Sequence, residues 1–147
     1  MAIKVMGIHH HAVRIDAGNH PLDTFQSFYS DVLGLEHDTG RPSVASVPGL
    51  WINVGDVGQI HLMGGQFPST LCKVPGEDPV DVHVALAVED VAEAKAELER
   101  QGVHFWSLVG VAGPETEQLF VRDPAGNMIE LHQYDKCRCR LKSRVTK

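Results

Sequence analysis

Four side chains that can bind a metal ion occur at matching places in the two halves of the chain. The segment around His10 aligns with the segment around His83, and the segment around His61 aligns with the one around Glu130. The spacing is 51 residues from His10 to His61 and 47 residues from His83 to Glu130. Three imidazoles and one carboxylate suit a borderline divalent ion such as Zn²⁺, Ni²⁺, Fe²⁺, Mn²⁺ or Co²⁺. We therefore predict one such ion bound to His10, His61, His83 and Glu130.

The alternation of residue types around these positions is typical of β-strands. After His83, the apolar residues Val84, Leu86 and Val88 alternate with small ones, which is the period of a strand with one buried face. The metal-capable residues lie on the face opposite the one that would pack against a helix. His11 aligns with Val84, so we predict a packing role for it.

Each half of the chain predicts the same order of elements, which indicates a duplication. The first module, residues 5–63, is predicted to contain a strand, a helix and three strands, at 7–15, 21–33, 35–39, 50–54 and 59–63. The second module, residues 81–135, is predicted to repeat this order at 83–89, 90–102, 103–107, 118–122 and 128–133. Prolines and glycines predict a linker at 64–80, and a basic tail follows at 136–147. The predicted fold is α+β, with two tandem β-α-β-β-β modules in a curved mixed sheet around the metal site.

Both predicted helices carry local signals. Pro21 suits the first helical position, and Asp90 with Glu93 forms a predicted capping box. Apolar residues at helical spacing predict the face of each helix that packs on the sheet. These residues are Leu22, Phe25, Phe28, Tyr29, Val32 and Leu33 in the first helix, and Val91, Ala94 and Leu98 in the second.

The net charge of −6 is unevenly distributed over the 147 residues. The tail holds six of the 13 basic residues and no acidic one, so the rest of the chain has seven basic and 19 acidic residues. An acidic body disfavours a nucleic-acid surface, and no apolar run approaches the ~20 residues that span a bilayer. The N-terminus has no signal-peptide pattern, and three cysteines are too few for a disulfide framework. We therefore predict a cytoplasmic protein without nucleic-acid or membrane partners.

Several strings in the chain resemble those of the vicinal oxygen chelate superfamily, which includes glyoxalase I, bleomycin-resistance proteins, methylmalonyl-CoA epimerase and extradiol dioxygenases. They are IHH at 8–10, FYSDVLGL at 28–35, IHL at 60–62, HVAL at 83–86 and DPAGNMIEL at 123–131. The resemblance implies paired modules whose sheets close around a divalent metal. It also implies that His10, His83 and Glu130 are ligands, that His61 occupies a variable fourth position, and that the chain forms a homodimer.

The resemblance implies three kinds of function, and the sequence favours one of them. The shared chemistry is capture of two adjacent oxygens of a small substrate by the metal. Four ligand-capable residues favour a lyase or isomerase over an extradiol dioxygenase. Phe120 favours it too, because the dioxygenases that this chain resembles have a tyrosine there. A metal-free binding protein of the bleomycin type lacks the ligands and is the third alternative. In the favoured reaction Glu130 or His61 transfers the proton.

Three further side chains are predicted to bind the substrate. Arg14 can hold an anionic group through two parallel hydrogen bonds, with an ion pair to Asp16 or Asp38 as the alternative. Phe120 lies close before Glu130 in the sequence, and His132 shares a strand face with Glu130. The substrate itself is predicted only as a small molecule with adjacent oxygens.

Overall fold

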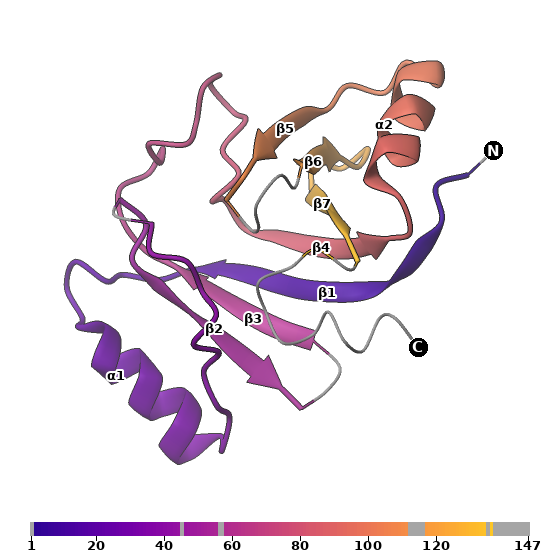
Figure 1. The fold of residues 1–147 in the computed structure, drawn as a ribbon. Coiled ribbons are helices and arrows are strands. Elements are labelled where there is room, and N and C mark those ends of the chain that lie inside the picture. The colour runs from indigo at the N-terminus through magenta and orange to yellow at the C-terminus, as the bar shows by residue number, and fades with distance from the viewer. Residues whose placement is uncertain (1, 45, 56–57, 112–116, 135, 137–147) are drawn as a thin grey trace.

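A mixed sheet of seven strands forms the centre of the molecule (Figure 1). The computed structural model describes residues 2–44, 46–55, 58–111, 117–134 and 136. In chain order the elements are β1 Val5–Arg14, α1 Leu22–Ser27, a π-helical turn Phe28–Val32, β2 Gly49–Val54, β3 Gly58–Met63, β4 His83–Val88, α2 Val91–Arg100, β5 Trp106–Val109, β6 Glu117–Arg122 and β7 Met128–Gln133. Their order across the sheet is β2-β3-β1-β4-β7-β6-β5. The predicted α+β fold is confirmed.

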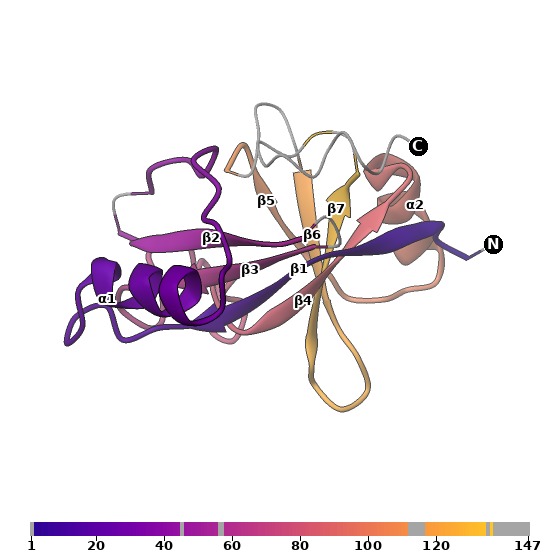
Figure 2. The same ribbon diagram turned by 90° about the horizontal axis from the view of Figure 1, so that it is seen from below.

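The two halves of the chain meet where β1 pairs with β4 in the middle of the sheet. These two strands run antiparallel, and each pairs in parallel with the last strand of its own half, β3 or β7. Figure 2 shows the strong twist of the sheet, because β5, β6 and β7 stand at a steep angle to β2 and β3. The sheet is therefore curved, and residues from both halves share its concave face.

α2 packs on the strands of the second half as predicted. The Asp90 carboxylate accepts a hydrogen bond from the backbone N–H of Glu93 (3.0 Å) and caps the helix. The buried residues of this core are Val88, Val91, Ala94, Leu98, Leu119 and Leu131. The three inward-facing helix positions predicted from the sequence are thereby confirmed.

α1 leaves much of its predicted apolar face in contact with solvent. No residue of α1 or of the π-helical turn is buried, and Phe28, Val32 and Leu33 are 50%, 67% and 51% exposed. The helix lies beside β2 (Figure 1). The predicted packing role of His11 is wrong, since its side chain is exposed. The helices pack mainly elsewhere, α1 beside β2 and α2 on β6 and β7, and the His11 side chain on β1 is left exposed.

The strand predicted at residues 35–39 is reduced to a single bridge. His37 pairs with Ile52 at one point beside β2. The Asp38 carboxylate accepts a hydrogen bond from the backbone N–H of Gly40 (2.8 Å), which turns the chain away from the sheet. A local side-chain turn therefore ends the pairing that the residue types predicted.

The strand predicted at residues 103–107 lies three residues later, as β5. Gly102 adopts a left-handed conformation (φ 68°) at the end of α2. The backbone N–H of Val103 still bonds to the carbonyl of Leu98 (2.9 Å). The helix-terminating turn thus extends past Gly102, and the chain rejoins the sheet only at Trp106.

The structure also bears on two predictions made from composition, which concern membrane-spanning segments and the basic tail. In the ranges that it describes, no helix is long and apolar enough to cross a membrane. Residues 137–147, which form nearly all of the predicted basic tail, lie outside the described residues.

Replacing Leu98 by Ala should lower the free energy of unfolding by about 2–5 kcal/mol, because it removes buried methyl groups and leaves a cavity in the core. Urea denaturation followed by circular dichroism measures this loss. Val74→Ala is the control, since Val74 is exposed and the change should stay within about 0.5 kcal/mol. Equal effects of the two substitutions would contradict the core described here.

Candidate metal centre

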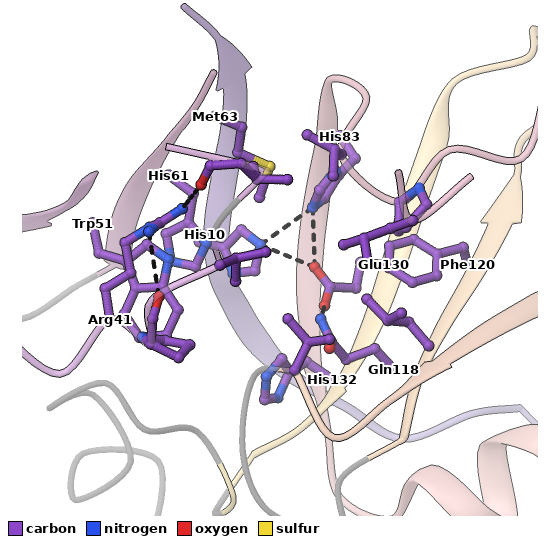
Figure 3. Close-up of a pocket in the computed structure, with 18 residues that line it drawn as sticks. His10, Arg41, Trp51, His61, Met63, His83, Gln118, Phe120, Glu130 and His132 are labelled. Carbon is purple, nitrogen blue, oxygen red and sulfur yellow. Dashed lines mark hydrogen bonds and ion pairs between the residues drawn. The ribbon is translucent and has the colours of Figure 1, made fainter. Parts of the chain in front are cut away.

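Three of the four predicted ligands converge on the concave face of the sheet (Figure 3). The Nε2 atom of His10 lies 2.9 Å from Oε2 of Glu130, and the Nε2 atom of His83 lies 3.0 Å from the same oxygen. The two imidazole nitrogens are 3.3 Å apart. All three side chains are buried, and together they draw on both halves of one chain.

The strand register explains why these three side chains meet. His10 of β1 pairs with Ala85 of β4, and Ala85 in turn pairs with Glu130 of β7. Because Ala85 carries only a methyl group, the imidazole and the carboxylate can meet above it. His83 lies two residues before Ala85, on the same face of β4, and completes the group.

The separations of the donor atoms fit a divalent ion. Atoms bound about 2.1 Å from one ion are about 3.0 Å apart at right angles and about 3.4 Å apart at tetrahedral angles. The three separations here, 2.9, 3.0 and 3.3 Å, lie close to this range.

Neighbouring groups orient the donors. His83 Nδ1 hydrogen-bonds the carbonyl of Asp81 (2.6 Å), so Nδ1 carries a proton and can leave the Nε2 lone pair to an ion. Gln118 donates to the second oxygen of Glu130. The donor set therefore has the supporting hydrogen bonds typical of metal sites.

The ionisation of the buried donors also suits a metal. Burial lowers the pKa of His10 to about 4, so its ring is neutral near pH 7. Burial tends to raise the pKa of Glu130, but the adjacent His10 and His83 rings bring it well below its usual value. Burial tends to lower the pKa of His83, but its hydrogen bond and charge interaction with Glu130, together with its contact to Asp81, raise the pKa above its usual value. The group thus offers the carboxylate of Glu130 and the neutral imidazole of His10 to a metal ion.

His61, the fourth predicted ligand, lies beside this group. Its ring stacks on the ring of His10 (3.7 Å between centroids) and on that of Trp51 (4.7 Å). Burial lowers its pKa well below the usual value, so the ring is neutral. The role of His61 as a ligand remains a prediction, because its nitrogens do not join the three converging donors.

A buried network fixes the orientation of the His61 ring. Gln59 donates its side-chain N–H groups to Asp38 (2.8 Å) and Asn53 (2.9 Å), so its Oε1 must face His61. His61 Nε2 lies 2.9 Å from that oxygen and therefore carries the proton. The lone pair of His61 is on Nδ1, and binding of a metal by Nε2 would require this hydrogen bond to break.

His9 belongs to the site, although strict alternation places it on the outer face. The register of β1 against β4 shifts between Ile8 and His10, which is a β-bulge with one extra residue. His9 and His10 are consequently both buried, with their Nδ1 atoms 2.7 Å apart. The bulge depends on the pairing partner, so the local sequence gave no signal for it.

The three donors lie in the wall of a largely apolar cavity (Figure 3). Phe120, a predicted substrate-binding residue, lines it beside the donors. The Phe120 ring lies edge-on to His83 (5.9 Å) and stacks on Trp106 (5.8 Å). The described apolar residues of the lining are Pro42, Val44, Val47, Trp51, Met63, Leu71, Pro79, Val80, Leu108, Val111 and Phe120.

His132, the second predicted substrate-binding residue, also lines the cavity. Its ring stacks on His9 (4.6 Å), and its Nδ1 hydrogen-bonds the carbonyl of Gln133 (2.9 Å). The buried Nε2 has no hydrogen-bond partner among the described residues. Since Nδ1 holds the proton, Nε2 offers a lone pair that can accept a hydrogen bond from a ligand.

Arg14, the third predicted substrate-binding residue, lies at the end of β1. It is not among the described residues that line the cavity. Its guanidinium donates to the carbonyls of Gly64 (3.4 Å), Gly65 (2.9 Å) and Gln66 (3.3 Å). It also lies 5.5 Å from the centre of the Phe67 ring. Arg14 thus holds the segment after β3, and its role with a substrate remains a prediction.

Comparison with known proteins defines the class of this chain. The family described as "Glyoxalase/Bleomycin resistance protein/Dioxygenase superfamily" matches residues 8–131. The chain therefore belongs to this family, the vicinal oxygen chelate superfamily. It is 32% identical over 119 residues to "Glyoxylase I 4" of Arabidopsis thaliana, a match that covers 80% of this chain and 64% of the plant protein.

Solved structures share the fold at low sequence identity. The methylmalonyl-CoA epimerase of Mycobacterium tuberculosis is 23% identical and has a TM-score of 0.67, with 90% of this chain and 91% of that chain covered. The epimerase of Streptomyces coelicolor, in complex with 2-nitronate-propionyl-CoA, is 18% identical with a TM-score of 0.63, and the match covers 90% and 98% of the two chains.

Replacing His10 by Ala should lower the affinity for a divalent ion by about 100-fold or more, because it removes one of three converging donors. Competition with a chelator, followed by elemental analysis, measures this change. His11→Ala is the matched control, since His11 is the next residue but is exposed on the other face of β1. Stoichiometric metal retained by His10→Ala would contradict the site.

Proposed function

We propose that the protein is a divalent-metal-dependent lyase or isomerase that acts on a small substrate with adjacent oxygens. The observation that carries this proposal is the convergence of His10, His83 and Glu130 in the wall of an apolar cavity. Its relatives include a plant protein named for glyoxalase I and two methylmalonyl-CoA epimerases. Substrates of these kinds, thiol adducts of 2-oxoaldehydes and acyl-CoA thioesters, are the first to test.

The cavity can position such a substrate with its oxygens toward the three donors. A divalent ion bound there would act as a Lewis acid that polarises two substrate oxygens and acidifies the C–H bond next to the polarised carbonyl. The apolar walls, Phe120 among them, exclude water from that carbon. His132 Nε2 can accept a hydrogen bond from a substrate hydroxyl.

Glu130 and His61 are the proposed groups for proton transfer. Glu130 is ionised, and its Oε1 is held by Gln118. His61 is a neutral imidazole that keeps its proton on Nε2, toward Gln59, and its lone pair on Nδ1. His61 can take a proton at Nδ1, whereas Glu130 would first have to release the ion or Gln118 from one of its oxygens, so variants must separate the two roles.

A second candidate function is ring-opening dioxygenation. Two histidines and one carboxylate that converge without His61 resemble the facial triad of non-haem iron oxygenases. Phe120, which faces the cavity beside His83, has no hydroxyl that could donate a hydrogen bond to oxygen or substrate. We therefore place this function second, and metal-free binding of small molecules third.

Metal-loaded protein should exchange a substrate C–H proton with solvent deuterium without consuming oxygen, as followed by NMR and an oxygen electrode. His61→Phe should keep the ring stack with His10 and Trp51 but remove both nitrogens. If His61 is the base, the rate should fall about 10²–10⁴-fold while metal content is unchanged.

Two results would redirect this proposal. Loss of metal from His61→Phe would make His61 the fourth ligand and leave Glu130 as the base, which Glu130→Gln then tests. Oxygen uptake with a catechol that depends on Fe²⁺ would replace the lyase or isomerase by the dioxygenase.

We also propose that the protein is a cytoplasmic homodimer. The exposed apolar residues Phe28, Val32 and Leu33 on one helical segment support a subunit contact. Sedimentation at micromolar concentration should give twice the 16.1 kDa mass of the chain. Val32→Asp should shift the protein toward the monomer, whereas Val109→Asp, at an equally exposed valine on β5, should not. A monomer in all three proteins would contradict the dimer.

A further inference from the structure

We propose that Arg41 binds an oxyanion of the substrate, a carboxylate or phosphate, in the same cavity as the three donors. The inference rests on the proposed function, because it assumes that the other end of the substrate lies at the donors. It adds a requirement on substrate class: a chelating pair of oxygens, an apolar middle and an anionic end.

Arg41 is the one permanent cation among the described residues of the cavity lining. The other polar members are four histidines, Gln118 and the Glu130 carboxylate. Figure 3 shows Arg41 on the side of the pocket that holds Trp51 and His61, with His10 between this side and Glu130. A ligand that reaches from the donors across the cavity can therefore place its far end near the guanidinium.

The guanidinium of Arg41 has spare hydrogen-bond donors. It donates to the carbonyls of Val47 (2.6 Å) and Pro42 (3.3 Å), and among the residues that the structure describes these two bonds leave three of its five N–H groups for other partners. Within the described ranges, no carboxylate lies within ion-pair distance of it. Burial lowers its pKa without any opposing acidic group. A partly buried cation with no anionic partner in the part of the chain that the structure describes is suited to an anion of a ligand.

The loop that carries Arg41 is held in place by close backbone contacts. A Cβ atom at Gly49 would overlap the carbonyl of Leu62 and come within 3.1 Å of Arg41 Nη2. A Cβ atom at Gly65, which has a φ of 91°, would overlap the carbonyl of Ser46. Glycine at these two positions lets β3 and the segment after it approach the residues on either side of Val47 closely.

Arg14 differs from Arg41 in its place relative to the cavity and in the number of its backbone contacts. Its guanidinium donates to three backbone carbonyls, and it is not among the described residues of the cavity lining. Between the two arginines, the contacts therefore assign anion binding to Arg41 and a structural role to Arg14.

The test uses metal-loaded protein and benzohydroxamate, whose two oxygens chelate metals and whose ring is apolar. Calorimetry compares it with the 3- and 4-carboxy and the 4-phosphono derivatives. At least one anionic probe should bind about 10- to 100-fold more tightly than benzohydroxamate, and added salt should reduce the difference. Arg41→Gln should abolish this preference and leave benzohydroxamate binding unchanged, while Arg41→Lys should keep part of it.

Arg14→Gln and Arg100→Gln are the matched controls. Arg100 is exposed on α2 and pairs with Glu97, away from the cavity, so both controls should keep the preference. Equal binding of all probes to the unaltered protein would overturn the role of Arg41 and leave the metal site standing. Loss of the preference in Arg14→Gln but not in Arg41→Gln would overturn it as well. If no hydroxamate binds, the proposed metal site fails, and this inference fails with it.

Discussion

A buried carboxylate is the constraint on which the arrangement of the site depends. Glu130 is 1% exposed, and a charge withdrawn from water to this extent is tolerated only when it is paired. Its partners are His10 from the first half of the chain and His83 from the second. The same charge therefore links the two halves at the place where β1 and β4 join them, and it brings together three atoms that suit a divalent ion.

Strand pairing extends this constraint across the whole sheet. One row of paired residues on the concave face crosses all seven strands, from β2 to β5: Asn53, Gln59, His10, Ala85, Glu130, Phe120 and Trp106. The amides at one end of the row orient His61, and the aromatic rings at the other end bound the cavity. A shift of β1 by one residue would move His10 to the outer face.

Much of the strand arrangement and of the donor set could be predicted from the sequence, because the repeat shows itself in local patterns of residue types. The strand period and the alignment of His10 with His83 predicted their shared face, and Asp90 marked the start of α2. The position of His9 could not be predicted, because a bulge is a property of two paired strands. The tautomer of His61 depends on Gln59 and its buried partners. Arg41 lies in a loop without periodicity, where only the folded contacts reveal its place.

The exposed face of α1 has a similar explanation. Helical spacing predicts that Phe28, Val32 and Leu33 pack on the sheet, but all three are exposed, because the spacing does not say what an apolar face contacts. The type of reaction likewise could not be predicted from the residue pattern. The three donors indicate chelation of adjacent oxygens, while the choice between lyase, isomerase and dioxygenase depends on where protons and oxygen go.

The most direct test of the central claim is the position of a bound ion. Crystals of the Zn²⁺-loaded protein, measured at the zinc absorption edge, should show one anomalous peak per chain about 2.0–2.2 Å from His10 Nε2, His83 Nε2 and Glu130 Oε2 of the same chain. A peak at another place, a peak whose ligands come from two chains, or no peak at full zinc loading would contradict the account.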